Sequence, residues 1–164
     1  MLTLPKTGQA ELSLQPDVLR DIFKHARPLG HNEAPSELNL GFGFMYYGLA
    51  RALRPQHVLV IGSGFGFSVV CLALGLKDNA DLGRLSFVDP SYSVFTHGPL
   101  RTVGGTAQWD DPQKVRAHFA RFGVEHLVTH YKQTSAQFFA TEATRLPTID
   151  MAFIDGSHAY ADER

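Results

Sequence analysis

The segment 57–76, HVLVIGSGFGFSVVCLALGL, constrains the fold more than any other part of the chain. It begins with large, mostly β-branched residues at 58–61, the pattern of a strand that is buried on both faces. Gly62, Gly64 and Gly66 then alternate with other residues, and an apolar helical segment without a polar face follows. A strand, a glycine turn and a helix in this order bring unpaired backbone N–H groups and the positive end of a helix to one point. The segment therefore predicts a binding site for an anionic group of a nucleotide-like ligand.

The rest of the chain alternates between helix and strand patterns. Helices are predicted at 16–26, at 36–53 with Ser36 as the N-cap, at 112–122, and from the N-cap Thr134 to about residue 143. Strands are predicted at 58–61, 85–89, 127–131 and 151–155. Short strands separated by helices are typical of a parallel sheet, because each crossover between parallel strands needs a long connection. We therefore predict an α/β fold, with an N-terminal helical cap over residues 1–54 and a sheet-forming domain over residues 55–164.

Composition excludes several classes of protein. The 164 residues include 15 basic and 16 acidic side chains, a net charge of −1, without a basic stripe for nucleic acid. The single cysteine, Cys71, lies in the apolar helical segment, so neither disulfides nor a cysteine-rich metal site are predicted. The N-terminus lacks a signal-peptide pattern, and no segment is apolar enough to span a membrane. We predict a cytoplasmic globular protein without nucleic-acid or membrane partners.

The spacing of the glycines discriminates between nucleotide-like ligands. A dinucleotide fingerprint requires G-x-G-x-x-G/A, but Phe67 stands where the last small residue is needed. A phosphate loop would require Gly-Lys-Ser/Thr, which the turn lacks. Asp89 ends the second strand, where a carboxylate can accept hydrogen bonds from both hydroxyls of a ribose, although a residue before Pro90 also suits a plain turn. The glycines and Asp89 together indicate a nucleoside site.

These segments resemble the class I S-adenosylmethionine-dependent methyltransferases. VLVIGSGFGFS at 58–68 is similar to the first motif of that family, and FVDPS at 87–91 is similar to its acidic strand end. QTSAQFF at 133–139 is similar to the segment that flanks the adenine. FIDGSHAYADER at 153–164 resembles the fourth-strand motif of a bacterial subgroup in which F-I-D-G-x-H-x-Y is frequent. The resemblance covers about residues 30–164 and implies a Rossmann-like parallel sheet with strand order 3-2-1-4 in the part present.

The resemblance also implies roles for individual residues. The cofactor-binding residues that the motifs imply are Gly62, Ser63, Gly64, Gly66, Asp89, Thr134, Ser135 and Asp155. Among them, the glycine turn would lie against the methionine moiety and Asp89 would bind the ribose. Thr134 or Ser135 would contact the edge of the adenine. Asp155 would lie near the transferred methyl group. Asp155 or His158 would act as the catalytic base where the acceptor must lose a proton.

Two features depart from the family pattern. Val60 stands where the family often has an acidic residue before I-G, which removes one polar contact to the cofactor. The sequence ends at Arg164, so the last three of the seven strands of the family sheet are missing. Strand four would then be an exposed apolar edge, which natural proteins avoid. We expect a fragment of a longer protein, or else a homodimer in which a second copy covers that edge.

The histidines and the loop at 90–112 each have two interpretations. His158 is as well explained by a solvated histidine as by a base or a metal ligand, and no metal site is predicted within this chain. His97 and Trp109 could form a substrate lid or belong to an ordinary surface loop. The histidines interpreted as surface or strand residues are His25, His118, His126 and His130. The N-terminal residues placed to close over the cofactor are Glu33, Ser36 and Tyr46.

We therefore expect S-adenosylmethionine-dependent methyl transfer to a small-molecule acceptor. The sulfonium is already a strong methyl donor, so the protein chiefly has to align it with a nucleophile for in-line displacement. One alternative is a catalytically silent methyltransferase-like module for binding or structure, which Val60 favours and Asp89 opposes. A weaker alternative is an NAD(P)-dependent oxidoreductase, which Phe67 opposes.

Overall fold

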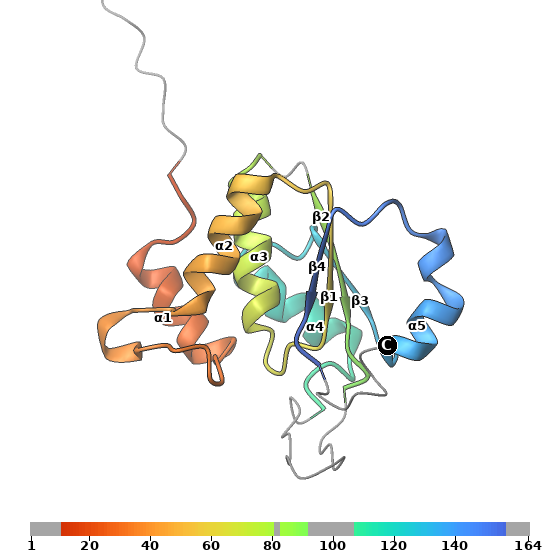
Figure 1. Cartoon of the computed structure of the whole chain (residues 1–164). Coiled ribbons are helices and arrows are strands. Elements are labelled where there is room, and N and C mark those ends of the chain that lie inside the picture. Colours follow the sequence, from red (N-terminus) through yellow and green to blue (C-terminus); the bar gives the residue numbers. More distant parts are fainter. Residues whose placement is uncertain (1–10, 81–82, 92–106, 157–164) are drawn as a thin grey trace, which may run out of the picture.

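A four-stranded parallel sheet forms the centre of the chain in the computed structural model, which describes residues 11–80, 83–91 and 107–156. The strands are β1 (His57–Ile61), β2 (Arg84–Val88), β3 (Val128–Tyr131) and β4 (Met151–Ile154), in the order β3-β2-β1-β4. One face carries the helices α1 (Pro16–His25), α2 (Phe42–Leu53), α3 (Phe67–Lys77) and α4 (Pro112–Ala120) (Figure 1). Helix α5 (Ser135–Thr141) lies on the opposite face (Figure 1). The predicted α/β fold and its strand order 3-2-1-4 are confirmed.

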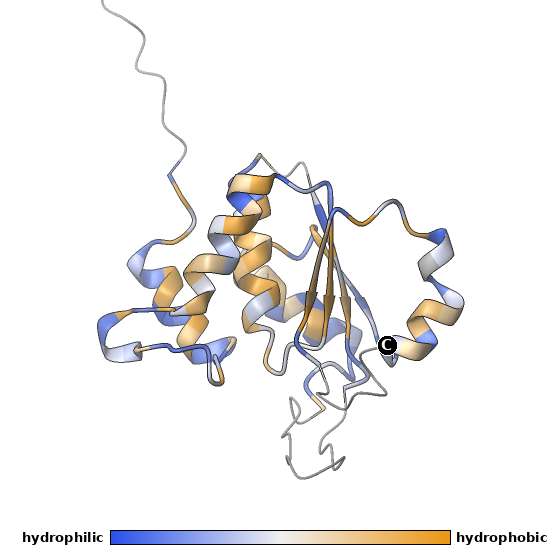
Figure 2. Ribbon diagram, in the orientation of Figure 1, coloured by the Kyte–Doolittle hydropathy of each residue, from blue (hydrophilic) through white to orange (hydrophobic). Residues whose placement is uncertain are grey.

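Strand β1 is buried on both faces because its alternate side chains enter two different clusters. Val58 and Val60 belong to the large core beneath α3, whereas Leu59 packs on the other face against Phe138 of α5. Helix α3 lies between α2 and the sheet, so all its residues from Phe67 to Leu76 are buried (Figure 1). This position explains why α3 has no polar face. Figure 2 shows the same concentration of apolar residues in α3 and the central strands.

The N-terminal helices share this core with the sheet. Ile22 of α1 and Tyr46 and Ala50 of α2 are buried in the same cluster as the side chains of β1. Close approach of α2 and α3 requires glycine on α3, because a Cβ on Gly75 would lie 2.7 Å from the Cβ of Ala50. The boundary predicted between residues 54 and 55 stays a prediction.

The helix predicted from Ser36 begins later than the sequence pattern indicated, so that prediction is wrong over its first turns. A short 3-10 helix, η1 (Pro35–Glu37), is followed by Leu38 with a φ of 54°. Helix α2 starts only after Gly41, where a Cβ would overlap the carbonyl oxygen of His31. That carbonyl accepts a hydrogen bond from the N–H of Phe42 at 2.8 Å. Tertiary contact with the preceding loop therefore decides where α2 begins.

Other helix boundaries agree with the sequence. Asp111 caps α4 by accepting a hydrogen bond from the N–H of Gln113 at 2.8 Å. Thr134 and Gln137 form the predicted capping box at the start of α5. A second 3-10 helix, η2 (Ala143–Arg145), follows α5. These caps depend on residues close in sequence, which makes them predictable.

Large apolar side chains are exposed at the end of β4 and along α2, among other places. Within the described residues, β4 pairs only with β1, and Ile154 at its end is 60% exposed. The outer side of α2 exposes a row of large apolar residues: Phe42, Met45, Leu49 and Leu53. A longer chain, or a second copy that covers the edge of β4, stays a prediction. Among the residues that the structure describes, no helix meets the length and hydropathy needed to cross a bilayer.

Candidate functional site

The glycine turn lies where the carboxyl ends of three strands meet. Gly62 follows β1 directly, and its N–H donates to the carbonyl oxygen of Val88 at the end of β2 at 2.8 Å. A Cβ on Gly62 would lie 2.5 Å from the carbonyl oxygen of Asp155, just beyond β4. Its φ of +71° also disfavours any residue with a side chain. Gly62 is therefore required for the close approach of β4 to the turn.

The rest of the turn combines buried hydroxyls with open space. The hydroxyl oxygens of Ser63 and Ser68 are buried and lie 3.0 Å apart. A Cβ on Gly64 would meet nothing within 4 Å, so the backbone of the turn borders open space at this point. Gly66 is the N-cap of α3, and no side chain caps that helix. The geometry suits an approaching ligand, because the positive end of α3 adjoins an uncrowded stretch of backbone.

Trp109 packs between the glycine turn and α4. Neither interpretation of this residue from the sequence, as part of a lid or of a surface loop, is therefore correct. Its indole is 1% exposed and stacks on Phe119 of α4, with the rings 5.7 Å apart and nearly parallel. The indole N–H donates to the carbonyl oxygen of Gly64 at 3.0 Å. Its backbone N–H donates to the hydroxyl of Ser91 at 2.9 Å. Trp109 thus links the glycine turn, the segment after β2 and α4.

His118 of α4 also lies behind the turn and is not the surface residue that the sequence indicated. A Cβ on Gly66 would lie 3.1 Å from its Nε2, a buried atom without a hydrogen-bond partner in the described part of the chain. Its Nδ1 lies 3.3 Å from the amide nitrogen of Gln108. Burial, aided by the charge of Arg121, lowers the pKa of His118 from 6.5 to about 4.

We expect this depressed pKa to make the fold sensitive to acid. In the unfolded chain His118 binds a proton below about pH 6.5, whereas in the folded chain it does so only below about pH 4. The free energy of unfolding should therefore fall by about 3 kcal/mol as the pH drops through this window. Urea unfolding of the wild type and of His118→Gln at several pH values checks this. His118→Gln should lose this part of the pH dependence of the free energy of unfolding. An unchanged pH dependence would contradict the low pKa of His118.

Asp89 ends β2 beside the turn, as the sequence predicted. Burial raises the pKa of its carboxyl group, and the backbone N–H groups of Ser91 and Ser63 oppose that rise. The N–H of Ser91 donates to Oδ1 of Asp89 at 2.7 Å. The carbonyl oxygen of Asp89 lies 3.0 Å from Nε2 of His130 on β3. The carboxylate is thus held in place at the edge of the sheet where Gly62 and Asp155 also lie.

Thr134 and Ser135 begin α5 on the far side of β3. The hydroxyl of Thr134 accepts from the N–H of Gln137 at 3.2 Å, and its own N–H donates to Oε1 of Gln137 at 3.0 Å. These bonds give Thr134 a structural role as a helix cap. Contact of Thr134 or Ser135 with an adenine stays a prediction.

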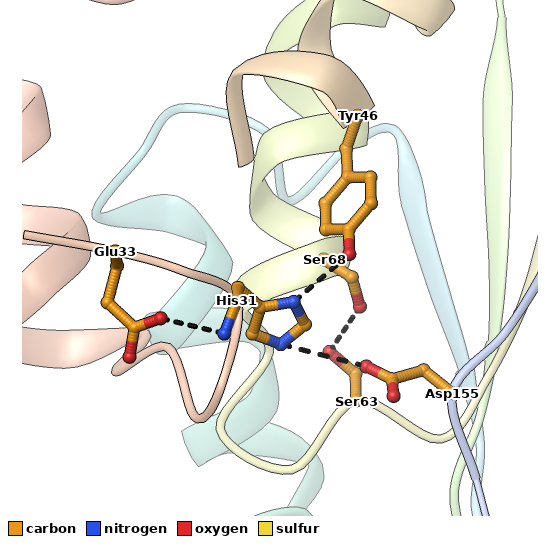
Figure 3. Close-up of polar contacts among 6 residues, drawn as sticks. All are labelled: His31, Glu33, Tyr46, Ser63, Ser68 and Asp155. Carbon is orange, nitrogen blue, oxygen red and sulfur yellow. Dashed lines mark hydrogen bonds and ion pairs between the residues drawn. The ribbon is translucent and has the colours of Figure 1, made fainter. Parts of the chain in front are cut away.

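Asp155 faces a residue that sequence reasoning missed, His31. Nε2 of His31 lies 3.9 Å from Oδ2 of Asp155, and its Nδ1 lies 3.0 Å from the hydroxyl of Tyr46 on α2 (Figure 3). Its backbone N–H donates to Oε2 of Glu33 at 2.7 Å. Glu33 and Tyr46, singled out from the sequence, thus gather around His31, whereas Ser36 is exposed on η1. In the sequence, only the polar His-Asn-Glu segment at 31–33 pointed to this loop, and it did not indicate a partner for His31.

Two residues singled out from the sequence, His97 and His158, lie outside the described residues. Within residues 11–80, 83–91 and 107–156, no group of three or more His, Cys, Asp or Glu side chains is placed to hold a metal ion.

A parallel 3-2-1-4 sheet with a glycine turn after β1 and an acidic residue after β2 defines a Rossmann-like domain. A family model described as a methyltransferase domain matches residues 59–164. The chain belongs to this family of methyltransferase domains. A comparison with curated proteins found no match.

Several solved structures share the fold. An O-methyltransferase from Bacillus cereus in complex with SAH has a TM-score of 0.54 and 18% identity, over 85% of this chain and 53% of that chain. TomG, an O-methyltransferase from Streptomyces achromogenes involved in tomaymycin synthesis and solved with SAM, has a TM-score of 0.51 and 18% identity, over 85% and 52% of the two chains. Cofactor-bound Rv0187 from MTB has a TM-score of 0.53 and 20% identity, over 92% and 56%. The chain thus spans about half the length of these proteins.

Proposed function

We propose that this chain binds S-adenosylmethionine and serves transfer of its methyl group to an oxygen atom of a small-molecule acceptor. The observation that carries the proposal is the meeting of Gly62, Asp89 and Asp155 at one edge of the sheet. Membership of the methyltransferase-domain family supports the reaction type. The structural relatives solved with SAM or SAH support the cofactor, and their description as O-methyltransferases supports oxygen as the acceptor atom.

The residues present fit this cofactor. Gly64 leaves room next to the turn, and the half-buried carboxylate of Asp89 can accept hydrogen bonds from two ribose hydroxyls. S-adenosylmethionine supplies a methyl group on a positively charged sulfur, which needs little further activation. The contribution of the chain is therefore to hold and orient the cofactor, because in-line displacement depends on alignment.

Asp155 is the residue we propose nearest to the reacting atoms. It follows β4, and its backbone contacts Gly62, so its carboxylate lies on the same side of the sheet as the turn. A carboxylate there can stabilise a positive charge on the donor or take a proton from an acceptor hydroxyl. The acceptor itself is defined only by chemical class: a small molecule with a hydroxyl group.

Replacing Asp89 by asparagine tests the cofactor site. The variant keeps the shape of the side chain but loses the charge, so the dissociation constant for S-adenosylhomocysteine should rise at least about tenfold. Isothermal titration calorimetry of wild type and Asp89→Asn measures this. Asp17→Asn, on the exposed first turn of α1, is the control and should bind like the wild type. No binding to the wild type, or equal binding to Asp89→Asn, would contradict the proposal.

A further inference from the structure

Ser91 combines a strained backbone with a buried side chain, two residues after Asp89. Its φ of +63° lies in the left-handed region, which glycine adopts without strain and serine does not favour. The residue is only 6% exposed. Strain of this kind persists only where the surrounding structure holds it in place, and it clusters at functional sites. Because glycine would adopt this backbone without strain, the contribution of a serine here has to come from its hydroxyl group.

The backbone of Ser91 orients the carboxylate of Asp89. Its N–H donates to Oδ1 of Asp89 at 2.7 Å, and it is the first N–H after Asp89 because Pro90 has none. Burial raises the pKa of Asp89, and the backbone N–H groups of Ser91 and Ser63 oppose that rise, so both face the carboxylate. A carboxylate has about four acceptor sites, so these two donors leave room for the two hydroxyls of a ribose.

The hydroxyl group of Ser91 connects this turn with two other segments. It accepts a hydrogen bond from the backbone N–H of Trp109 at 2.9 Å, and the indole of Trp109 donates to the carbonyl oxygen of Gly64. It also acts on the carboxylate of Asp110, whose pKa is lowered by the hydrogen-bonded Lys132 in the first place and by this hydroxyl as well. Nζ of Lys132, just after β3, lies 2.8 Å from Oδ1 of Asp110. The hydroxyl thus joins the end of β2 to the segment that supports the glycine turn.

We propose that Ser91 is a positioning residue for the ribose of the cofactor: the bond from Trp109 to its hydroxyl holds its N–H against Asp89, and so determines how strongly the site prefers a ligand with ribose hydroxyls. The inference rests on the function proposed above. Without the hydroxyl, the N–H of Trp109 loses this acceptor, and the strained backbone at residue 91 can relax away from Asp89. Hydrogen bonds weaken steeply when donor and acceptor are misaligned, so the bonds to the ribose hydroxyls should weaken most.

The experiment measures the dissociation constants of S-adenosylhomocysteine and of its 2′,3′-dideoxy analogue by isothermal titration calorimetry. The two ligands differ only in the ribose hydroxyls, so the ratio of the constants isolates the contribution of these hydroxyls. The wild type should bind S-adenosylhomocysteine about a hundredfold more tightly, because each hydrogen bond to a charged group contributes about tenfold. In Ser91→Ala this preference should fall about tenfold, while the affinity for the analogue stays within about twofold.

Two further variants separate positioning from a general loss of stability. Ser91→Gly removes the same hydroxyl but adopts the backbone without strain, so it remains informative if Ser91→Ala does not fold. It should show the same loss of preference. Ser13→Ala is the matched control, because it removes a hydroxyl that bonds to Oδ1 of Asp78 at 2.6 Å, at the end of α3 away from the glycine turn. It should keep the preference of the wild type.

Two results for the variants would overturn the inference. One is a preference in Ser91→Gly equal to that of the wild type. The other is an equal loss of affinity for both ligands, because the hydroxyl would then support only the stability of the fold. Equal binding of the two ligands to the wild type would also overturn it, although the cofactor would still bind. If S-adenosylhomocysteine does not bind to the wild type at all, the proposed function itself fails, which is a different outcome.

Discussion

Replacing Gly62 by alanine is expected to destabilise the chain by about 3 kcal/mol or more and to abolish cofactor binding. The added Cβ would lie 2.5 Å from the carbonyl oxygen of Asp155 and 2.6 Å from the Cα of Gly156, both backbone atoms that cannot rotate away. The φ of +71° adds strain of about 1–2 kcal/mol. Relief of the overlap has to move β4 away from the turn, which separates Asp155 from the site. Urea unfolding and calorimetry with S-adenosylhomocysteine measure the two effects.

Substitutions at two other glycines separate the effect of backbone strain from the effect of steric overlap. Gly64→Ala has the strain of a φ of +50° but no overlap, because nothing lies within 4 Å of its Cβ, so its loss of stability should be smaller. Gly48→Ala lies on the exposed side of α2 with open space around it, and it should raise stability by up to about 1 kcal/mol. If Gly62→Ala were no more destabilising than Gly64→Ala, the close approach of β4 to the turn would be wrong.

Replacing Trp109 by alanine is the second change with a large expected effect. Removing a buried indole from the core costs about 3–5 kcal/mol. The loss also removes the indole N–H that donates to the carbonyl of Gly64 and the ring that stacks on Phe119. The glycine turn should therefore become less ordered, and the affinity for S-adenosylhomocysteine should fall together with stability. Circular dichroism follows unfolding of this variant, because Trp109 is the single tryptophan and its fluorescence is lost.

A phenylalanine at position 109 distinguishes packing from the hydrogen bond. Trp109→Phe keeps an aromatic ring against Phe119 and Phe87 but has no N–H for the carbonyl of Gly64. This variant should recover much of the stability that Trp109→Ala loses. Its affinity for S-adenosylhomocysteine should stay lower than that of the wild type. Binding equal to that of the wild type would show that the hydrogen bond to Gly64 does not order the turn.

Much of the fold could be predicted because the residues that determine it are close in sequence. The run at 58–61 predicts a buried strand, and the alternation of strands and helices predicts a parallel sheet. Thr134 and Gln137 predict a helix cap because they are three residues apart on one turn. Asp89 could be predicted at the site because the carboxyl ends of parallel strands share one edge of the sheet.

The residues that escaped prediction act across long sequence separations. Trp109 reaches the carbonyl of Gly64, and His31 reaches the carboxylate of Asp155, yet no local pattern marks either pair. The beginning of α2 was misplaced for the same reason, because the backbone of His31 leaves no room for a side chain at position 41.

The sequence by itself determined the parallel α/β fold, the glycine turn and the placement of Asp89, because strand burial, backbone freedom and strand-end position are encoded locally. Only the tertiary structure decided that Trp109 supports the turn and that His31 faces Asp155. Both depend on how the loops and helices pack on the sheet. This packing brings together residues that are far apart in the sequence, and no local pattern indicates that they are in contact.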